Sequence, residues 1–199
     1  MIRPYQARDR DDVYDICVRT GAAGRDARGL FSTDELIPDI YAGPYVELEP
    51  EHAYVLDNGE RAVGYVIGTA STPAFVAACK REWLPRMRLR YDLPGEAPVT
   101  REQQKLLDMF SPERLLHPEL APHPAHLHID LLPEYQRGGH GRAMIGIFLA
   151  SVAAAGARSC HLMVRPGNAG ALVFYAKTGW RELAIESPGD WIVLTRPTT

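Results

Sequence analysis

The sequence predicts an α/β domain in which helices cover a β-sheet. Strand-like and helix-like segments alternate over the last third of the chain, and two earlier strand-like segments are joined by a turn signal. Such alternation is typical of a sheet covered by helices. The chain has 199 residues, of which 46% are hydrophobic and 24% charged, as expected of a globular protein with a substantial core. We therefore expect one domain over residues 1–199.

The first part of the chain predicts a strand, a helix, a loop and a second helix. Residues 2–6 have the pattern of a short strand. Residues 9–20 carry apolar side chains at helical spacing and aspartates in the first turn, where the helix dipole favours anions. The stretch Gly21–Gly29 is too rich in glycine for a regular element and predicts a loop. We expect the second helix over residues 33–41.

A β-hairpin is predicted next. Residues 52–57 and 61–70 have strand character, and Asn58-Gly59 lies between them. This dipeptide suits a two-residue type I′ turn, which requires positive φ at both central positions. The sequence therefore predicts two antiparallel neighbours at this point.

The stretch of about 71–123 interrupts the strand pattern and is interpreted as a helical insertion between strands. Pro73 suits the first turn of a helix, and a short helix is expected at 100–109. Apolar side chains recur along one face of the first helix: Phe75, Cys79, Trp83 and Met87. The apolar content is too small for an independent core, so we do not expect a separate domain.

The last third of the chain returns to alternating elements. The expected elements are strand 125–132, helix 140–155, strand 158–165, helix 169–178, and strands near 180–186 and 190–196. Sequential strands separated by helices at this spacing predict that the sheet continues through the C-terminal third.

Charge and composition exclude several classes of protein. The net charge is −3 and the pI about 6.2, so no global basic field would attract nucleic acid or an anionic membrane. The sequence contains no run of 18 apolar residues, so it predicts no membrane-spanning helix. The first residues do not have the pattern of a signal peptide, and we therefore expect a cytoplasmic protein. Cys17, Cys79 and Cys160 lie far apart in the sequence and predict reduced, buried thiols.

The junction Leu132–Gly141 is the clearest candidate for a binding site. The predicted strand ends at Pro133 and the next helix begins near His140, with three glycines in the turn: Gly138, Gly139 and Gly141. Glycine permits backbone conformations and close approaches that a Cβ would block. Amides at such a helix N-terminus predict a site for a pyrophosphate.

The spacing of the glycines indicates which phosphate compound is expected. Arg137 and Arg142 could add charge, but no Lys-Ser/Thr pair follows the glycines, so the P-loop pattern fails. A dinucleotide fingerprint also fits poorly, because this loop lies two-thirds along the chain rather than in an early βαβ unit. Without further signals the loop could equally be structural.

The loop resembles the acetyl-CoA loop of the GNAT acyltransferases. The pattern Gln136-x-x-Gly139-x-Gly141 matches, and downstream Asn168, Tyr175 and the Gly179-Trp180 pair follow in the order and spacing of that family. Taken singly, these residues could be a helix cap, a helix-face aromatic and a helix-ending glycine. The resemblance implies acetyl-CoA as co-substrate, bound by Leu131, Leu132, Gln136, Arg137, Gly138, Gly139, His140, Gly141, Arg142, Asn168 and Tyr175.

The likeness covers most of the chain. Residues 40–50, 79–94 and the segment from residue 164 onward resemble the acetyltransferase-like C-terminal domain of animal O-GlcNAcase and the free-standing bacterial acetyltransferases related to it. The resemblance implies the GNAT fold: a mixed, mostly antiparallel seven-stranded sheet with a central splay, flanked by helices, with a helical insertion between the third and fourth strands. In the animal domain the glycine loop is degenerate, whereas here it is intact.

The resemblance also implies a mechanism, in which an amine attacks the thioester directly within a ternary complex. Tyr175 would be the acid, and backbone groups near Leu131 and Leu132 would hold pantetheine and polarise the carbonyl. Some GNAT enzymes carry a Glu as base, but the matching position here is Met163.

Strand alternation offers other candidates for the base. His126, His128 and Asp130 share one face of strand 125–132, so Asp130 could orient His128 as the base. A solvated face or a structural His–Asp pair would give the same pattern. A third interpretation of these residues is a metal site. No ligand cluster elsewhere in the sequence supports one, and we expect no metal.

The acceptor is not specified by the sequence. We expect a primary amine, either a small molecule or a protein lysine, bound against Gly21–Gly29, Tyr41, Tyr45 and the insertion, since loops on a rigid sheet commonly carry specificity. Homodimers are common in the family, so a homodimer is possible. The alternative is a non-catalytic module that senses acyl-CoA or docks on a partner protein, as the Met163 position and the eroded animal loop suggest.

Overall fold

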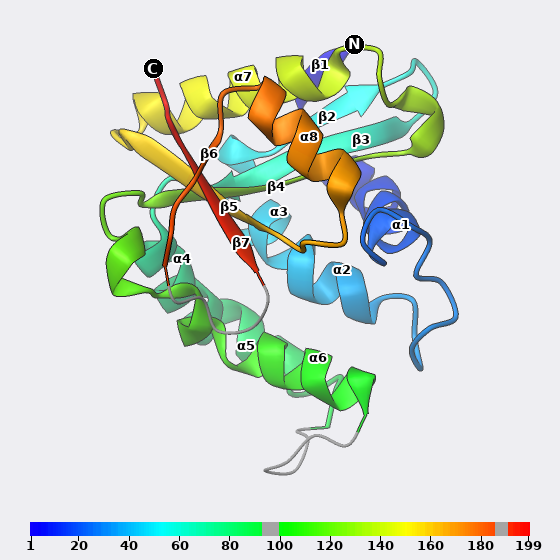
Figure 1. The fold of residues 1–199 in the computed structure, drawn as a ribbon. Coiled ribbons are helices and arrows are strands. Elements are labelled where there is room, and N and C mark those ends of the chain that lie inside the picture. Colours follow the sequence, from blue (N-terminus) through cyan, green and yellow to red (C-terminus); the bar gives the residue numbers. More distant parts are fainter. Residues whose placement is uncertain (93–99, 186–190) are drawn as a thin grey trace.

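The computed structural model describes residues 1–92, 100–185 and 191–199, and its centre is one seven-stranded sheet (Figure 1). The strand order is β1-β2-β3-β4-β5-β7-β6, and only β4 and β5 pair in parallel. The strands are β1 (Ile2–Pro4), β2 (Tyr54–Asp57), β3 (Ala62–Thr69), β4 (Ala125–Leu131), β5 (Ser159–Val164), β6 (Arg181–Glu182) and β7 (Ile192–Pro197). The predicted fold class, a mixed and mostly antiparallel seven-stranded sheet, is confirmed.

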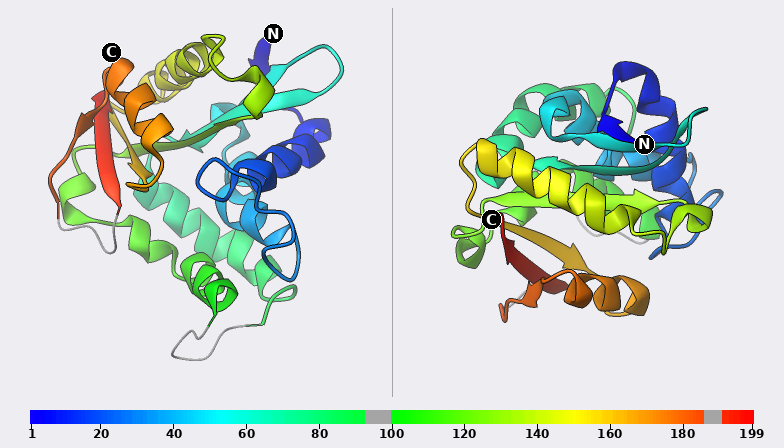
Figure 2. Two further views of the ribbon diagram at one scale, coloured as in Figure 1. Left: turned by 45° about the vertical axis from the view of Figure 1, so that its right-hand side comes forward. Right: turned by 90° about the horizontal axis from the view of Figure 1, so that it is seen from above.

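Helices cover both faces of the sheet (Figure 2). The longest, α7, packs against β2, β3 and β4 on one face, whereas α1 and α3 pack on the opposite face with α2 beside them. The helices are α1 (Arg10–Thr20), α2 (Leu36–Tyr41), α3 (Gly43–Leu48), α4 (Thr72–Ala78), α5 (Leu84–Met87), α6 (Arg101–Phe110), α7 (His140–Ala154) and α8 (Ala169–Lys177). The core therefore consists of two apolar layers, one on each side of the sheet.

The hairpin between β2 and β3 differs from the predicted two-residue turn. The strands end at Asp57 and resume at Ala62, so the loop has four residues. Within the Asn58-Gly59 pair only Gly59 has positive φ, at 103°. Asn58 instead turns its side chain inward, and its Oδ1 accepts the amides of the last two loop residues at 3.0 and 2.9 Å. The type I′ prediction is wrong because this Asx-type turn satisfies the loop amides instead.

The sequence reading also missed one helix. The segment after α2 forms α3, which has Pro44 in its first turn, where proline is well tolerated. A 3-10 turn at Pro50–His52 follows, so β2 begins at Tyr54 rather than at residue 52. Most other boundaries lie within about three residues of the prediction. Residues 186 and 190 of the last two predicted strands lie outside the described residues.

The insertion between β3 and β4 packs onto the main body through a second apolar cluster. The helix that starts at Thr72 runs through a π-helical turn, Cys79–Trp83, into α5, and α6 lies beside them. The cluster contains Leu36, Ile40, Trp83, Leu84, Met87, Leu106 and Met109. Because the first two of these residues belong to α2, the insertion shares this core with the rest of the chain, and Trp83 is a packing residue.

The two parallel strands at the centre of the sheet separate. Over their described residues, β4 and β5 pair at only two positions, Ala125 with Cys160 and His126 with His161. Beyond these positions the strands diverge toward the C-terminal end of β4, as the GNAT resemblance implied. A sheet that opens at its centre offers backbone groups to a ligand in the gap.

Two expectations from composition can be compared with the structure. Cys17, Cys79 and Cys160 are all free and buried, which confirms the predicted thiols. Burial raises the pKa of the Cys160 thiol well above its usual value, so this thiol is inert near neutral pH. Within the described ranges, no helix has the length and apolarity needed to cross a membrane.

Candidate active site

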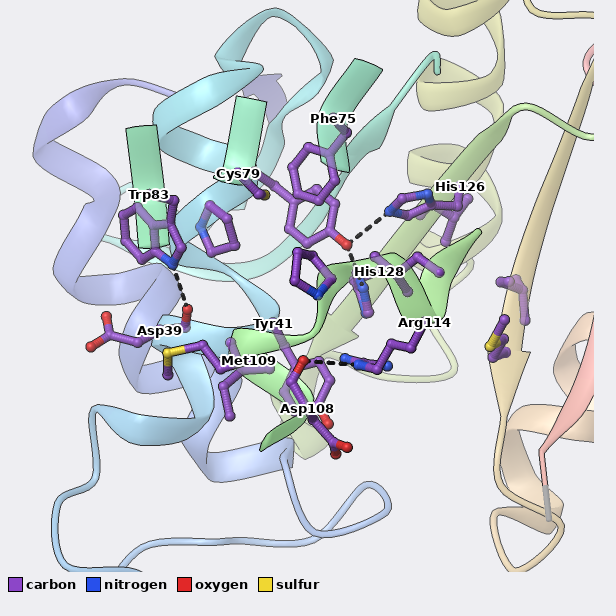
Figure 3. A pocket seen from close by; sticks show the side chains of 18 of the residues that line it. Asp39, Tyr41, Phe75, Cys79, Trp83, Asp108, Met109, Arg114, His126 and His128 are labelled. Carbon is purple, nitrogen blue, oxygen red and sulfur yellow. Dashed lines mark hydrogen bonds between the residues drawn. The ribbon is translucent and has the colours of Figure 1, made fainter. Parts of the chain in front are cut away.

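Two cavities meet where β4 and β5 separate. The first, which we call the insertion cavity, encloses about 100 Å³ between these strands, α2, α3 and the insertion (Figure 3). The second, the splay cavity, encloses about 230 Å³ between the same strands, the loop after α1, and α8. Both cavities are lined by Tyr41, Leu127, His128, Leu162, Met163 and Trp191. Two molecules bound on either side would therefore meet at His128.

The splay cavity brings together most of the side chains that the sequence singled out. His128 and Asp130 line it from β4, Asn168 lines it from the N-cap of α8, and Tyr175 lines it from the C-terminal half of that helix. Met163 faces them from β5. These residues come from three elements, and the splay lets them surround one space.

His128 is held by a chain of hydrogen bonds that runs through α3 and α4. Its Nε2 lies 3.2 Å from the Tyr45 hydroxyl, which lies 2.8 Å from Nε2 of His126. Nδ1 of His126 in turn lies 2.7 Å from Oγ1 of Thr72, and that hydroxyl lies 2.8 Å from the Pro124 carbonyl oxygen. In Figure 3, dashed lines join His126 and His128 to the same hydroxyl oxygen.

The direction of each bond in this chain follows from its last member. Because a carbonyl can only accept, the Thr72 hydroxyl donates to Pro124 and accepts from Nδ1–H of His126. Neutral His126 then has a bare Nε2, which accepts the Tyr45 proton. The Tyr45 oxygen is left to accept from Nε2–H of His128. The chain thus fixes the tautomer of His128 and leaves its Nδ1 as the nitrogen that can take up a proton.

Burial keeps both imidazoles neutral at physiological pH. It lowers the pKa of His128 to about 4 and the pKa of His126 well below its ordinary value, with further lowering by the nearby Arg114 and His161. A charged imidazole is disfavoured where water is excluded. This neutrality is consistent with the tautomers that the hydrogen bonds require.

Asp130 does not form the predicted pair with His128. Its Oδ2 accepts the hydroxyl of Tyr65 at 2.7 Å instead. Tyr65 stands directly opposite Asp130 on β3, and directly opposed side chains on antiparallel strands are closer than those two apart along one strand. Burial raises the pKa of Asp130 to about 6, against the opposing hydrogen bond from Tyr65. Asp130 thus lies on the predicted face of the strand, but its hydrogen-bond partner is Tyr65 rather than His128.

Tyr175 presents a free hydroxyl. Its ring packs edge-on against Trp180, with centroids 5.8 Å apart, and no hydrogen bond to the hydroxyl is formed among residues 1–92, 100–185 and 191–199. Burial, followed by the Asp130 carboxylate, raises the pKa of Tyr175. The phenol therefore stays protonated and can donate a hydrogen bond into the splay cavity.

The glycine loop ends in an uncapped helix N-terminus. Gly139 is the N-cap of α7 in the left-handed conformation, with φ 82°, and no side chain caps the helix there. A Cβ on Gly141 would come 3.1 Å from the Phe174 ring, and one on Gly138 would meet the His140 ring at the same distance. The first amides of a 15-residue helix are thus left for an anion, in a cradle that side chains would fill.

The polar side chains around this loop mostly brace the structure. Gln136 donates its side-chain amide to the Leu131 carbonyl at 2.9 Å. A guanidinium nitrogen of Arg142 reaches the Lys177 carbonyl at the end of α8, 3.3 Å away. Asn168 caps α8 through Oδ1, which accepts the Ala171 amide at 3.2 Å. Arg137 is exposed and has φ 64°. Two of these bonds tie the loop to the strand before it and to α8.

The two residues predicted to bind pantetheine through their backbone, Leu131 and Leu132, differ in the direction of their amides. The Leu132 amide donates to Val63 at 3.0 Å, and its carbonyl accepts the Tyr135 amide at 2.9 Å. The Leu132 amide is therefore not available to pantetheine, whereas its carbonyl oxygen can accept a second hydrogen bond. Successive amides of an extended strand point to opposite edges, so the Leu131 amide points toward the gap with β5.

Sequence reasoning missed several residues of this site. Tyr65 and Thr72 complete the hydrogen bonds of Asp130 and His126, and Trp191 lines both cavities with the Arg165 guanidinium 4.3 Å from its ring. Hydroxyls one or two elements away carry no local signal of such contacts. Tyr41 and Tyr45, expected in the acceptor wall, do line the insertion cavity.

Comparisons with known proteins identify the family. No family model matches the chain. Protein O-GlcNAcase of Rattus norvegicus is 31% identical over 201 residues, covering 98% of this chain and 22% of that protein. The crystal structure of SsHAT is 45% identical with a TM-score of 0.96, covering 100% of this chain and 98% of that one. The chain belongs to the GNAT superfamily of acetyltransferases.

A more distant GNAT structure agrees in fold. A GNAT superfamily phosphinothricin acetyltransferase from Sinorhizobium meliloti, solved in complex with AcCoA, is 12% identical with a TM-score of 0.58, covering 99% of this chain and 87% of that one. The resemblance predicted from the sequence is confirmed by the SsHAT and O-GlcNAcase matches. The chain spans about a fifth of the length of the curated O-GlcNAcase relatives.

Proposed function

We propose that this protein transfers an acetyl group from acetyl-CoA to a primary amine within a ternary complex. The observation that carries the proposal is the meeting of two cavities at His128, with the free Tyr175 hydroxyl in one of them. A donor on one side and an acceptor on the other would react at their common wall. Holding both reactants in place supplies much of the rate enhancement of such a transfer.

The N-terminus of α7 is the proposed site for the pyrophosphate. The uncapped amides after Gly139 and the space above Gly141 suit an anion that approaches the backbone closely. Asn168 and Tyr175 line the splay cavity and, with the Leu131 amide, would hold the pantetheine arm. Leu132 would contribute through its carbonyl oxygen, because its amide already donates to Val63. Acetyl-CoA supplies an acyl thioester that a neutral amine can attack.

Four residues of the chain would handle protons and charge. His128 accepts the amine proton at Nδ1 while Nε2–H stays bonded to Tyr45, so the imidazole is held through the transfer. The Leu131 amide donates to the oxygen on which charge develops. Tyr175 donates to the departing thiolate, and its raised pKa suits a hydrogen-bond donor better than a freely ionising acid. Asp130, with a pKa of about 6, is ionised at neutral pH and holds negative charge near Tyr175.

A binding measurement tests the first half of the proposal. We expect acetyl-CoA to bind the purified protein with micromolar affinity in calorimetric titration, and a Gly139→Trp, Gly141→Trp variant to lose that binding. The bulky side chains would occupy the cradle and strain the left-handed N-cap. A Gly146→Ala variant, altered in the exposed middle of the same helix where nothing lies within 4 Å, is the matched control. A folded wild type that binds no acetyl-CoA would refute the proposal.

A non-catalytic acyl-CoA sensor is the second candidate. Met163, which takes the place of the Glu of some GNAT enzymes, lines both cavities and cannot accept a proton. The two candidates agree on binding and differ on turnover. Release of free thiol from acetyl-CoA that depends on an added amine supports the enzyme, whereas tight binding with no release across a panel of amines supports the sensor.

A further inference from the structure

The charged side chains of the insertion cavity indicate what kind of acceptor it suits. Three formally charged residues line it: Asp39, Asp108 and Arg114. The remaining lining is mostly aromatic and apolar, with Tyr41, Phe75, Trp83, Met109 and Trp191 among its members. An unpaired charge in a pocket lined in this way favours a ligand of the opposite charge.

Asp39 is fully used within the protein. It has no exposed surface, and its two oxygens accept the hydroxyls of Tyr14 at 2.7 Å and Tyr91 at 2.8 Å. The guanidinium of Arg90 pairs with the same carboxylate at 3.1 Å. These bonds join α2 to α1 and to the segment after α5. The Asp39 carboxylate is therefore not available to a cationic amine.

Asp108 is also neutralised. Its carboxylate lies 3.6 Å from Nζ of Lys105 and accepts the Gln104 side-chain amide at 3.2 Å. Lys105 in turn donates to the Tyr41 hydroxyl at 2.6 Å. The backbone carbonyl of Asp108 has a separate function, because it accepts Nε–H of Arg114 at 2.9 Å.

Arg114 is exposed, and its charge is not compensated by any of the described residues. Within the part of the chain that the structure describes, no carboxylate lies within ion-pair distance of its guanidinium. The bond from Nε to Asp108 fixes the plane of the guanidinium and leaves its terminal nitrogens free. Figure 3 shows this side chain reaching between Asp108 and His128. A guanidinium held in this way presents a planar fork that matches a carboxylate.

The histidines of the cavity do not offset this charge. Burial lowers the pKa of His126, His128 and His161, so all three are neutral at physiological pH. The described lining of the cavity thus carries one net positive charge, on Arg114, which acts on His128. A simple ammonium or a lysine side chain gains nothing from this field, whereas an anionic group does.

We propose that the acceptor is a small amine that also bears a carboxylate, an amino-acid-like molecule with an apolar or aromatic body whose carboxylate pairs with Arg114. This inference rests on the proposed acetyl transfer and names its substrate class. The carboxylate would anchor the molecule, the aromatic lining would hold its side chain, and the amine would lie at His128. Pairing also removes the positive charge that opposes protonation of His128, so the correct acceptor improves the base that deprotonates it.

The test uses pairs of amines that differ only in the carboxylate: phenylalanine and 2-phenylethylamine, tyrosine and tyramine, tryptophan and tryptamine, leucine and isoamylamine. Thiol release from acetyl-CoA gives kcat/KM for each. We expect the amino acid of the best pair to exceed its decarboxylated partner at least tenfold. Arg114→Gln should lower kcat/KM for that amino acid about 10- to 100-fold, as expected for loss of a charge-assisted pair, and change that of the amine less than about threefold.

Two variants serve as controls. Arg114→Lys should restore part of the preference, because it keeps the charge and loses the fork. Arg81→Gln removes an exposed arginine of the insertion that pairs only with its neighbour Glu82 among the described residues, and should change nothing. A wild type that prefers the decarboxylated member of every pair, or an Arg114→Gln variant that loses both members equally, would overturn the proposal.

A binding measurement separates this inference from the proposed function. Calorimetric titration of each amino acid and its amine, in the presence of coenzyme A, reports recognition without turnover. Carboxylate-dependent binding that Arg114→Gln abolishes, with no thiol release by any amine, would keep this inference and refute acetyl transfer. Thiol release that shows no carboxylate preference would keep acetyl transfer and refute this inference. If no amino acid binds and none supports thiol release, the inference is also refuted.

Discussion

The two edges of β4 differ in how they are paired. Along one edge, β4 pairs with β3 at six successive positions, from Gly64 with Leu131 to Thr69 with His126. Along the other edge it pairs with β5 at two. The same strand is thus held by a continuous ladder on one side and open on the other, and both cavities lie along the open side.

This difference shows how the site can be open and still precise. His128 and Asp130 stand on the strand whose ladder with β3 is continuous, so their backbone positions are fixed even where β5 is absent. Sites on well-paired strands hold geometry better than sites on loops. The open edge supplies space and unpaired backbone amides, and the closed edge supplies rigidity.

Breaking the closed edge should have the largest effect on the protein. A Cβ on Gly68 would come 2.1 Å from the His126 carbonyl oxygen and 2.6 Å from the Phe148 ring. Gly68→Val should therefore lower the free energy of unfolding by about 3 kcal/mol or more, measured by urea denaturation. Gly146→Ala, in the open helical position, should instead raise it by about 1 kcal/mol. Equal stabilities of the two variants would contradict the tight packing of this edge.

The open edge is tested by removing one oxygen from it. Tyr175→Phe keeps the ring packing against Trp180 and loses the hydroxyl that faces the splay cavity. We expect kcat for amine-dependent thiol release to fall about 100-fold, the lower range for a lost proton donor, with acetyl-CoA affinity and thermal stability unchanged. A variant with normal kcat would remove Tyr175 from the mechanism and leave only a packing function.

The two edges also differ in how far the sequence predicted them. The glycine loop, α7 and α8 were predicted because their signals are local: glycines, a cap and a helical face within a few residues. The chain through His128 was not predicted, because Tyr45 lies 81 residues from His126 and Thr72 lies 54 away. Alternation placed Asp130 on the correct face, but only the register with β3 revealed Tyr65 as its partner.

The hydrogen-bond chain itself can be broken by removing one oxygen atom, the hydroxyl of Tyr45, from the lining of the insertion cavity. Tyr45→Phe leaves Nε2 of both His126 and His128 without their shared partner and frees the His128 tautomer. We expect kcat to fall about tenfold with little change in KM, and unfolding free energy to fall by about 1–3 kcal/mol for the unsatisfied buried groups. As a control, Tyr54→Phe alters a half-buried tyrosine of β2. An unchanged kcat despite lost stability would make the chain purely structural.

The smallest effect should distinguish the two candidate bases, because their pKa values differ. If His128 is the base, its pKa of about 4 leaves it deprotonated down to mildly acidic pH, and Asp130→Asn should change kcat/KM less than about threefold at pH 8. If Asp130 is the base, kcat/KM should fall as pH drops through about 6, and this limb should vanish in Asp130→Asn along with most activity.

The pH dependence of stability tests separately whether Asp130 titrates in this range. The folded pKa of Asp130 is raised above its unfolded value, so its contribution is present at low pH and is lost as pH rises toward 6 and above. Wild type should therefore lose stability relative to Asp130→Asn between about pH 4 and 7. Urea midpoints of the two proteins across that range, measured beside the rate profiles, show whether Asp130 titrates there at all. If Asp130 titrates but kcat/KM does not change with its titration, the base is His128, at the junction of the two cavities.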